Sequence, residues 1–160
     1  MISIGIRSVL LTGVILIAGV PVTVSAADLK AKLVACPANK TAIGDVGSCG
    51  KIWKLKSGEA KLSDDGKLHV EVKGLVLNDE TTGEFNGTPD GVDAVAAAVI
   101  CSGPNGAAVA AQTDVVTLAK NGDAKINAKV SLPNGCIAPV VVLRERYEGK
   151  IGGWLAATGM

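Results

Sequence analysis

The chain has 160 residues, about the length of one domain, and carries 16 lysines and arginines against 15 aspartates and glutamates. This balance lacks the basic excess of nucleic-acid-binding proteins, and a hydrophobic fraction of 48% excludes a disordered chain. A single histidine leaves little for the usual general-base or metal chemistry. Composition therefore favours one folded domain that is neither a nucleic-acid binder nor a histidine-dependent enzyme.

The first 26 residues have the pattern of a secretory signal peptide. Arg7 precedes an uncharged apolar run at 9–20, Pro21 ends that run, and small residues up to Ala26 offer a cleavage site. The run is shorter than the roughly 20 residues of a membrane-spanning helix, and an uncleaved N-terminal anchor is the alternative. Cleavage would leave 27–160 as a single domain with no transmembrane segment and 15 charges of each sign. This pattern predicts a secreted, periplasmic or cell-surface protein.

All four cysteines lie in the expected mature chain, and an even number in an exported domain is typical of disulfide bonds. Of the three connectivities we favour Cys36–Cys49, which closes a local Pro- and Gly-containing loop, and Cys101–Cys136, which joins elements far apart in sequence. Zinc is the competing interpretation, but no CxxC pair exists and His69 stands alone. We therefore expect no metal site, no catalytic thiol and no cofactor.

Turn dipeptides divide the chain into short β-type segments. Asn-Gly pairs, which adopt positive φ readily, occur at 86–87, 105–106, 121–122 and 134–135. The apolar and polar residues of 67–73 alternate, which is typical of a strand with one buried face. The segments expected to be strands are 28–35, 51–56, 59–63, 67–73, 92–101, 107–118, 123–131, 138–146 and 150–158.

This spacing predicts an all-β fold, an antiparallel β-sandwich that is Greek-key or immunoglobulin-like, with about eight or nine strands stapled by disulfides. Residues 92–101 are apolar on both faces, which indicates a central strand. A helix is the alternative for 92–100, because alanine is the best helix former. Residues 60–72 and 116–128 align as two similar hairpins, from an internal duplication or from convergence on one favourable turn.

Aromatic side chains are scarce: the chain has two tryptophans, one tyrosine and one phenylalanine. Small apolar side chains bury little area each, at about 25 cal/mol per Å², so stabilising disulfides are physically reasonable. We expect Trp53 in the core, on the same face as Leu55. Trp154 follows Gly152-Gly153, a pair that indicates a bulge or a close backbone approach. A functional interpretation would instead make the two tryptophans a surface for stacking a sugar.

One long loop at 78–93 carries five acidic residues and no lysine or arginine. Charge is segregated along the expected mature chain, with a net +3 over 27–73, −6 over 74–123 and +3 over 124–160. Clustered carboxylates can hold Ca²⁺, which takes about six to eight oxygen ligands, but no D-x-D-x-D-G spacing is present, so a solvated loop is the simpler interpretation. The candidate ligand-binding residues are Asp79, Glu80, Glu84, Asp90, Asp93 and Trp154.

No sequence motif indicates catalysis. The chain has no G-x-S-x-G, H-E-x-x-H or P-loop motif and no G-x-G-x-x-G after a strand, and His69 lies in the polar phase of 67–73. A carboxylate pair for glycoside hydrolysis is compatible with the composition, but such sites usually lie among aromatic side chains that grip the sugar. We therefore expect no catalytic residues and no enzymatic activity.

Three stretches, SGEAKLSDDGKLHVEVKGLVL, VDAVAAAVIC and AKVSLPNGCIAPVVVL, resemble small exported bacterial proteins of unknown function. The resemblance covers most of 57–157 and rests on hairpin glycines, the step from Lys73 to Leu75 and the pair Cys101/Cys136. The first hairpin is also similar to chordin-type (CHRD) domains and to the Greek-key sandwich of copper–zinc superoxide dismutases, whose metal-binding histidines are absent here. The resemblance implies a sandwich and export, and it supplies no activity.

Two classes of function follow from the sequence. The first is a non-catalytic exported β-sandwich protein with an interaction, envelope or surface-associated role and an unidentified protein or envelope partner. The second is a secreted module that binds a small ligand or glycan through the 78–93 loop or the Trp154 region. A binding module should show a concave pocket lined by Trp154, Tyr147 or the acidic loop. An interaction protein should show a flat apolar patch or an unprotected edge strand.

Overall fold

The computed structural model describes residues 28–37, 41–89 and 91–159, so the expected signal peptide lies outside the described residues. Short alternating segments between turns form strands rather than helices, with one short 3₁₀ helix. The elements are β1 (Leu29–Ala35), β2 (Trp53–Lys54), β3 (Ser57–Leu62), β4 (Lys67–Lys73), β5 (Val76–Leu77), η1 (Glu80–Phe85), β6 (Val92–Gly103), β7 (Gly106–Gln112), β8 (Val116–Thr117), β9 (Ala124–Lys129), β10 (Ile137–Tyr147) and β11 (Lys150–Thr158). In this described part of the chain, no helix is long and apolar enough to cross a membrane.

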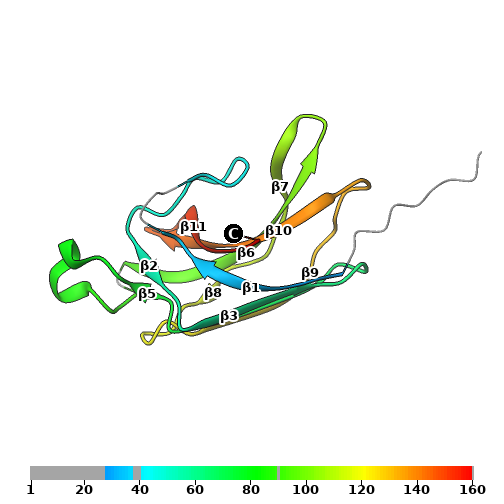
Figure 1. Cartoon of the computed structure of the whole chain (residues 1–160). Helices are drawn as coiled ribbons and strands as arrows, with labels where there is room; N and C mark the ends of the chain where they lie inside the picture. Colours follow the sequence, from blue (N-terminus) through cyan, green and yellow to red (C-terminus); the bar gives the residue numbers. More distant parts are fainter. Residues whose placement is uncertain (1–27, 38–40, 90, 160) are drawn as a thin grey trace, which may run out of the picture.

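Nine strands form one antiparallel sheet in the order β7-β6-β10-β11-β1-β3-β4-β9, with β8 also paired to β6. Strands β2 and β5 pair separately. The sheet curls, so that β6, β10 and β11 lie above β1 and β3 (Figure 1) and β8 approaches β9. The inward faces of both halves enclose one core. The expected all-β, antiparallel, disulfide-linked fold is confirmed, and its hydrogen bonds run through a single curled sheet.

Most of the expected strands form, with two local differences. The segment 51–56 contains only the short strand β2, and 107–118 is divided into β7 and β8. The division occurs at Thr113, whose hydroxyl accepts a hydrogen bond from the backbone N–H of Ala97 at 3.1 Å while its own N–H donates to the Ala97 carbonyl at 2.9 Å. The Thr113 hydroxyl thus replaces a backbone carbonyl as the acceptor for the Ala97 N–H. Strands β7 and β8 both pair with the same edge of β6.

The central strand β6 is buried on both faces, as its apolar pattern predicts, and the helical alternative for 92–100 is wrong. Residues 94–100 are each at most 3% exposed. The loop 41–49 lies over one face of this part of the sheet: a Cβ on Gly44 would come within 3.1 Å of Ile100 Cγ2. The same loop bonds to two further strands, since Asp45 accepts from the N–H of Val109 and the N–H of Trp154 donates to the carbonyl of Gly47, both at 2.9 Å.

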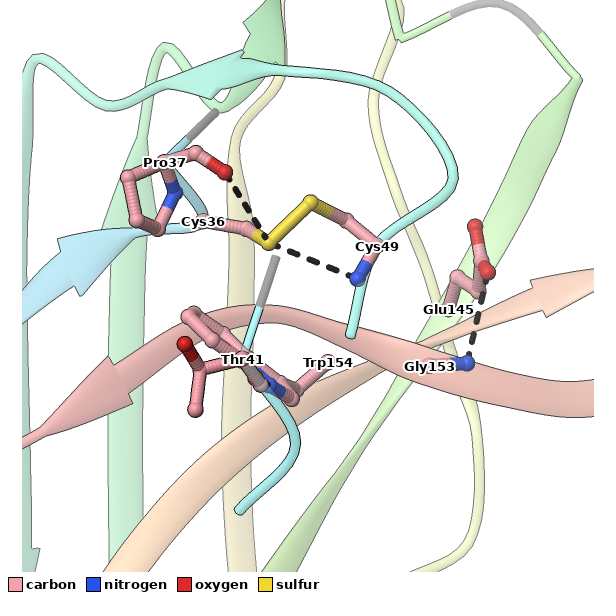
Figure 2. The surroundings of a disulfide bond; sticks show 7 residues. All are labelled: Cys36, Pro37, Thr41, Cys49, Glu145, Gly153 and Trp154. Atoms are coloured by element: carbon pink, nitrogen blue, oxygen red, sulfur yellow. Dashed lines mark hydrogen bonds between the residues drawn. A yellow bond between two sulfur atoms is a disulfide. The ribbon is translucent and has the colours of Figure 1, made fainter. Parts of the chain in front are cut away.

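Both expected disulfides form, Cys36–Cys49 and Cys101–Cys136, and no cysteine in the described ranges is free. The first lies beside Trp154, whose indole Nε1 donates to the Thr41 carbonyl at 2.9 Å (Figure 2). It therefore anchors the loop that covers β11. The second joins β6 to the turn before β10. Two disulfides indicate an oxidising, extracellular-type environment.

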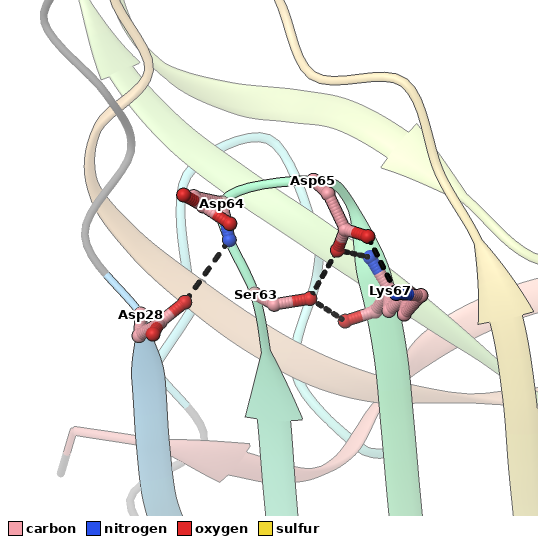
Figure 3. A network of polar contacts seen from close by, with 5 residues as sticks. All are labelled: Asp28, Ser63, Asp64, Asp65 and Lys67. Carbon is pink, nitrogen blue, oxygen red and sulfur yellow. Dashed lines mark hydrogen bonds and ion pairs between the residues drawn. The ribbon is translucent and has the colours of Figure 1, made fainter.

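The two similar turn sequences form the same turn but lead to different pairings. In 63–67 and 119–123, the first residue donates its N–H to the carbonyl of the last, and Gly66 and Gly122 each have a φ of +81°. In the first turn, Asp65 also accepts from the Ser63 hydroxyl and pairs with Lys67 (Figure 3). Strands β3 and β4 then pair as a hairpin, whereas β8 pairs with β6 and β9 with β4. The second turn carries the chain from one end of the sheet to the other.

Removing the two disulfides separately should destabilise the fold to different extents. The chain-entropy estimate gives about 3 kcal/mol for the shorter loop and about 4 kcal/mol for the longer one. We expect both double variants to have a lower free energy of unfolding than the parent protein. The loss should be smaller for Cys36→Ala/Cys49→Ala than for Cys101→Ala/Cys136→Ala, and urea denaturation measures it. Equal stability of either double variant and the parent protein would contradict this expectation.

Candidate ligand-binding site

A pocket of about 560 Å³ lies between the 78–93 loop and the end of β10. Three of the four aromatic side chains of the whole chain line it: Trp53, Phe85 and Tyr147. Ligand sites in proteins are typically concave and lined by apolar and aromatic side chains with a few polar groups. In a chain with so few aromatic residues, their gathering at one pocket marks this place as the candidate site.

Each aromatic side chain comes from a different element. Trp53 lies in β2, opposite Leu77 of β5, and is only 6% exposed, so it forms a buried wall. Phe85 ends η1 and is 45% exposed, and Tyr147 ends β10 and is 50% exposed. These last two rings therefore present surface to solvent at the pocket and are available for contact with a ligand.

The position of the Tyr147 ring depends on a glycine. A Cβ on Gly91 would lie 2.6 Å from Tyr147 Cε2, and Gly91 has a φ of +76°, which favours glycine. Tyr147 is also directly opposite Val92 in the β6–β10 ladder. The ring therefore packs against the backbone at the end of the acidic loop, and this contact closes one side of the pocket.

Glu145 is the half-buried carboxylate of the pocket. It lies two residues before Tyr147, on the same face of β10, and its Oε1 accepts a hydrogen bond from the Gly153 N–H at 3.3 Å (Figure 2). A Cβ on Gly152 would lie 2.8 Å from the same oxygen, so the expected close approach at Gly152-Gly153 is confirmed. Burial raises the pKa of Glu145, and no described cation pairs with it.

Hydrogen-bond donors also line the pocket. Lys51 Nζ is 3.5 Å from the Thr81 hydroxyl, and both residues line the pocket with Thr82. Asp79 fixes this part of η1, because its carboxylate accepts from the Thr81 N–H at 3.0 Å and from the Thr81 hydroxyl at 2.5 Å. These bonds from Thr81 lower the pKa of Asp79. Asp79 therefore acts as a cap that holds the lining residues.

The remaining acidic candidates do not converge on one point. Glu80 and Glu84 are exposed on η1, and Asp90 lies outside the described residues. Asp93 pairs with Arg146 through two contacts, at 2.5 and 3.2 Å, and this partner lowers its pKa. Within the described ranges, no three histidine, cysteine, aspartate or glutamate residues lie close enough to hold a metal ion.

Trp154 lies apart from the acidic loop. Its side chain is fully buried, with an exposed fraction of 0%, and its indole N–H is already bonded to the Thr41 carbonyl. Trp154 therefore does not line the pocket, although its neighbour Gly153 bonds to Glu145, and Trp53 is the tryptophan that does. Trp53, Phe85, Glu145 and Lys51 were not among the site residues expected from sequence. Tyr147 and the 78–93 loop, which contains Phe85, are the parts of the pocket that the sequence indicates for a binding module.

Comparison of the chain with protein-family models, with curated proteins and with solved structures finds no match. The identification of the candidate site therefore rests on the geometry of this structure alone.

Ionised Glu145 should destabilise the folded protein at neutral pH. In the unfolded chain the carboxyl ionises near its ordinary pKa of 4.5, whereas burial raises that pKa in the folded chain. The destabilisation is thus absent below 4.5, develops between 4.5 and the raised folded-state pKa, and is constant above that pKa. We expect Glu145→Gln to be more stable than the parent at about pH 7 and equally stable at about pH 4.

Urea denaturation at both pH values measures this difference. Glu84→Gln, at an exposed position of η1, is the matched control for removing one carboxylate. A Glu145→Gln variant that is less stable than the parent at neutral pH would show that the ionised carboxylate stabilises the fold.

Proposed function

We propose that this protein is an exported, non-catalytic β-sheet protein that binds a small sugar-type ligand in the pocket between the acidic loop and β10. The gathering of Trp53, Phe85 and Tyr147 around one hollow carries this proposal. A concave pocket lined by Tyr147 and loop residues is the feature expected of a binding module. The proposal assigns no catalytic residue.

The chemistry of the pocket suits a polyhydroxylated ligand. A sugar ring offers an apolar C–H face, which packs on exposed aromatic rings such as those of Phe85 and Tyr147, and hydroxyl groups, which need donors and acceptors. Lys51 supplies donors, and Glu145 supplies an acceptor that no described cation occupies. The pocket volume of about 560 Å³ lies within the range of small-molecule sites.

Export is supported by the signal-peptide pattern of 1–26 and by two disulfides. We place the protein outside the cytoplasm, as a secreted, periplasmic or cell-surface protein, in keeping with its resemblance to small exported bacterial proteins. We also propose that the curled sheet is a β-sandwich with Greek-key, immunoglobulin-like connections. The meeting of its two halves in one core supports that arrangement.

An interaction with an envelope protein is the second candidate function. Strands β7 and β9 end the order of the sheet, and edge strands offer backbone groups for pairing with another chain. Ile137, near the β7 side, is the most exposed large hydrophobic residue among those described, at 61%. These features favour a protein partner at the β7 edge, away from the pocket.

Removing either exposed aromatic ring should weaken binding of a saccharide. We expect Phe85→Ala and Tyr147→Ala each to lower the affinity by about three- to tenfold, the general value of one aromatic contact. Isothermal titration calorimetry with a panel of mono- and disaccharides gives the affinity. Tryptophan fluorescence of a Trp154→Phe variant, in which Trp53 is the remaining tryptophan, gives a second readout at the pocket.

The control is Ile137→Ala, which removes an exposed apolar side chain far from the pocket and should leave the affinity unchanged. If no saccharide of the panel binds the parent protein, or if all three variants bind equally well, the sugar-binding proposal is wrong.

A further inference from the structure

The outward face of β1, β3, β4 and β9 carries an excess of lysine. The ladder registers place Lys30, Lys61 and His69 in one row across the strands and Lys32, Glu59, Glu71 and Lys125 in the next. Seven lysines and two glutamates occupy outward positions of the four strands, a net charge of +5 with His69 neutral. We call the following set the lysine face: Lys30, Lys32, Lys61, Lys67, Lys73, Lys125 and Lys129.

Ion pairs within the sheet use only part of this charge. Glu59 contacts Lys61 at 2.6 Å and Lys30 at 3.9 Å, and Glu71 contacts Lys73 at 3.3 Å. All of these side chains are at least 37% exposed, so such pairs are weak and readily exchanged.

Three lysines of the face form no ion pair with any described residue: Lys32, Lys125 and Lys129. The aspartates near the face, Asp28, Asp64 and Asp65, gather at its turn end, where Asp65 pairs with Lys67 (Figure 3). The unpaired positive charge therefore lies along the two outer strands of the face, β1 and β9.

The negative charge of the chain lies elsewhere. Segment 74–123, which contains β5 to β8, has one lysine against seven acidic residues. Asp79, Glu80 and Glu84 of this segment lie at η1, outside the four strands of the lysine face. A negatively charged surface would therefore attract the lysine face and repel the acidic side chains at η1.

The layout of the lysine face fits an extended anionic surface better than a single polymer chain. At ordinary sheet spacings its lysines spread over about 15 Å across the strands and about 20 Å along them. The face uses lysine and no arginine, and lysine acts as a hydrated point charge rather than a bidentate phosphate clamp. The exposed rings of Phe85 and Tyr147, which could stack on sugars, lie at the pocket instead.

We propose that the lysine face docks the protein on an anionic lipid bilayer. Basic residues near such a surface are attracted by its negative potential, within about one Debye length, without inserting into the hydrocarbon. The contact is reversible and weakens with salt. Docking through β1, β3, β4 and β9 leaves the β7 edge on the opposite side of the molecule.

Co-sedimentation with vesicles tests this proposal on the protein as it is exported. We expect binding to vesicles of equal parts phosphatidylglycerol and phosphatidylcholine at low salt, and loss of that binding at about 0.5 M NaCl. Vesicles of phosphatidylcholine alone should not bind. Lys125→Gln/Lys129→Gln should lower binding by about 30-fold, from the general contribution of one lysine at an anionic membrane.

The matched control is Lys120→Gln/Lys150→Gln, which removes the same charge outside the lysine face and should retain most of the binding. Equal losses in both double variants, equal binding to neutral vesicles, or binding that salt does not weaken would overturn the proposal. The proposal would also be overturned if the protein did not bind vesicles but bound soluble polyphosphate or self-associated at low salt. None of these outcomes depends on the sugar pocket, whose residues are unchanged in both variants.

Discussion

The fold depends on covering the second face of an alanine-rich sheet. Strand β6 is buried on both faces at 94–100, and β11 is buried at 154–157. The loop 41–49 lies over this face, held by the Cys36–Cys49 disulfide and by the bond from Trp154 Nε1 to the Thr41 carbonyl (Figure 2). Close approach requires small residues, since a Cβ on Gly153 would lie 2.3 Å from the Ser48 carbonyl oxygen. The absence of a side chain at Gly153 thus allows the backbone of β11 to contact the backbone of the 41–49 loop, and the Cys36–Cys49 disulfide holds that loop in place.

The pocket borders this covered part of the sheet. Strand β10 is held between β6 and β11, and its register shifts around Arg144, where β11 carries Gly152-Gly153. The irregularity brings the Glu145 carboxylate to the Gly153 N–H, while Tyr147 two residues later packs on Gly91. One side of the pocket thus belongs to the half-buried end of β10, next to its fully buried residues 141–143. The other side belongs to η1, which the Asp79 cap stabilises.

Charge and aromatic surface are kept apart on this molecule. The exposed rings gather at the pocket, whereas lysines gather on the outward face of β1, β3, β4 and β9. An electrostatic contact at the lysine face would hold the molecule in one orientation without using the pocket. Together, the two proposals describe an exported protein that the lysine face positions on an anionic membrane and that binds its ligand in the pocket.

Most strands and turns, and the favoured pairing of the cysteines, could be predicted from the sequence, whereas the short strand β5 and the division of 107–118 could not. Period-two alternation shows which residues of a strand share a face, as in 67–73, and Gly66 and Gly122 mark turns because their left-handed φ favours glycine. The order of the strands in the sheet follows only from the folded structure. In the folded protein, β8 pairs with β6 rather than with β9, and four lysine-bearing strands share one face. Trp53, Phe85 and Tyr147 line one pocket, whereas Trp154 is buried. Alternation and turn chemistry act over a few residues, whereas these neighbours are tens of residues apart and are chosen by packing around the shared core.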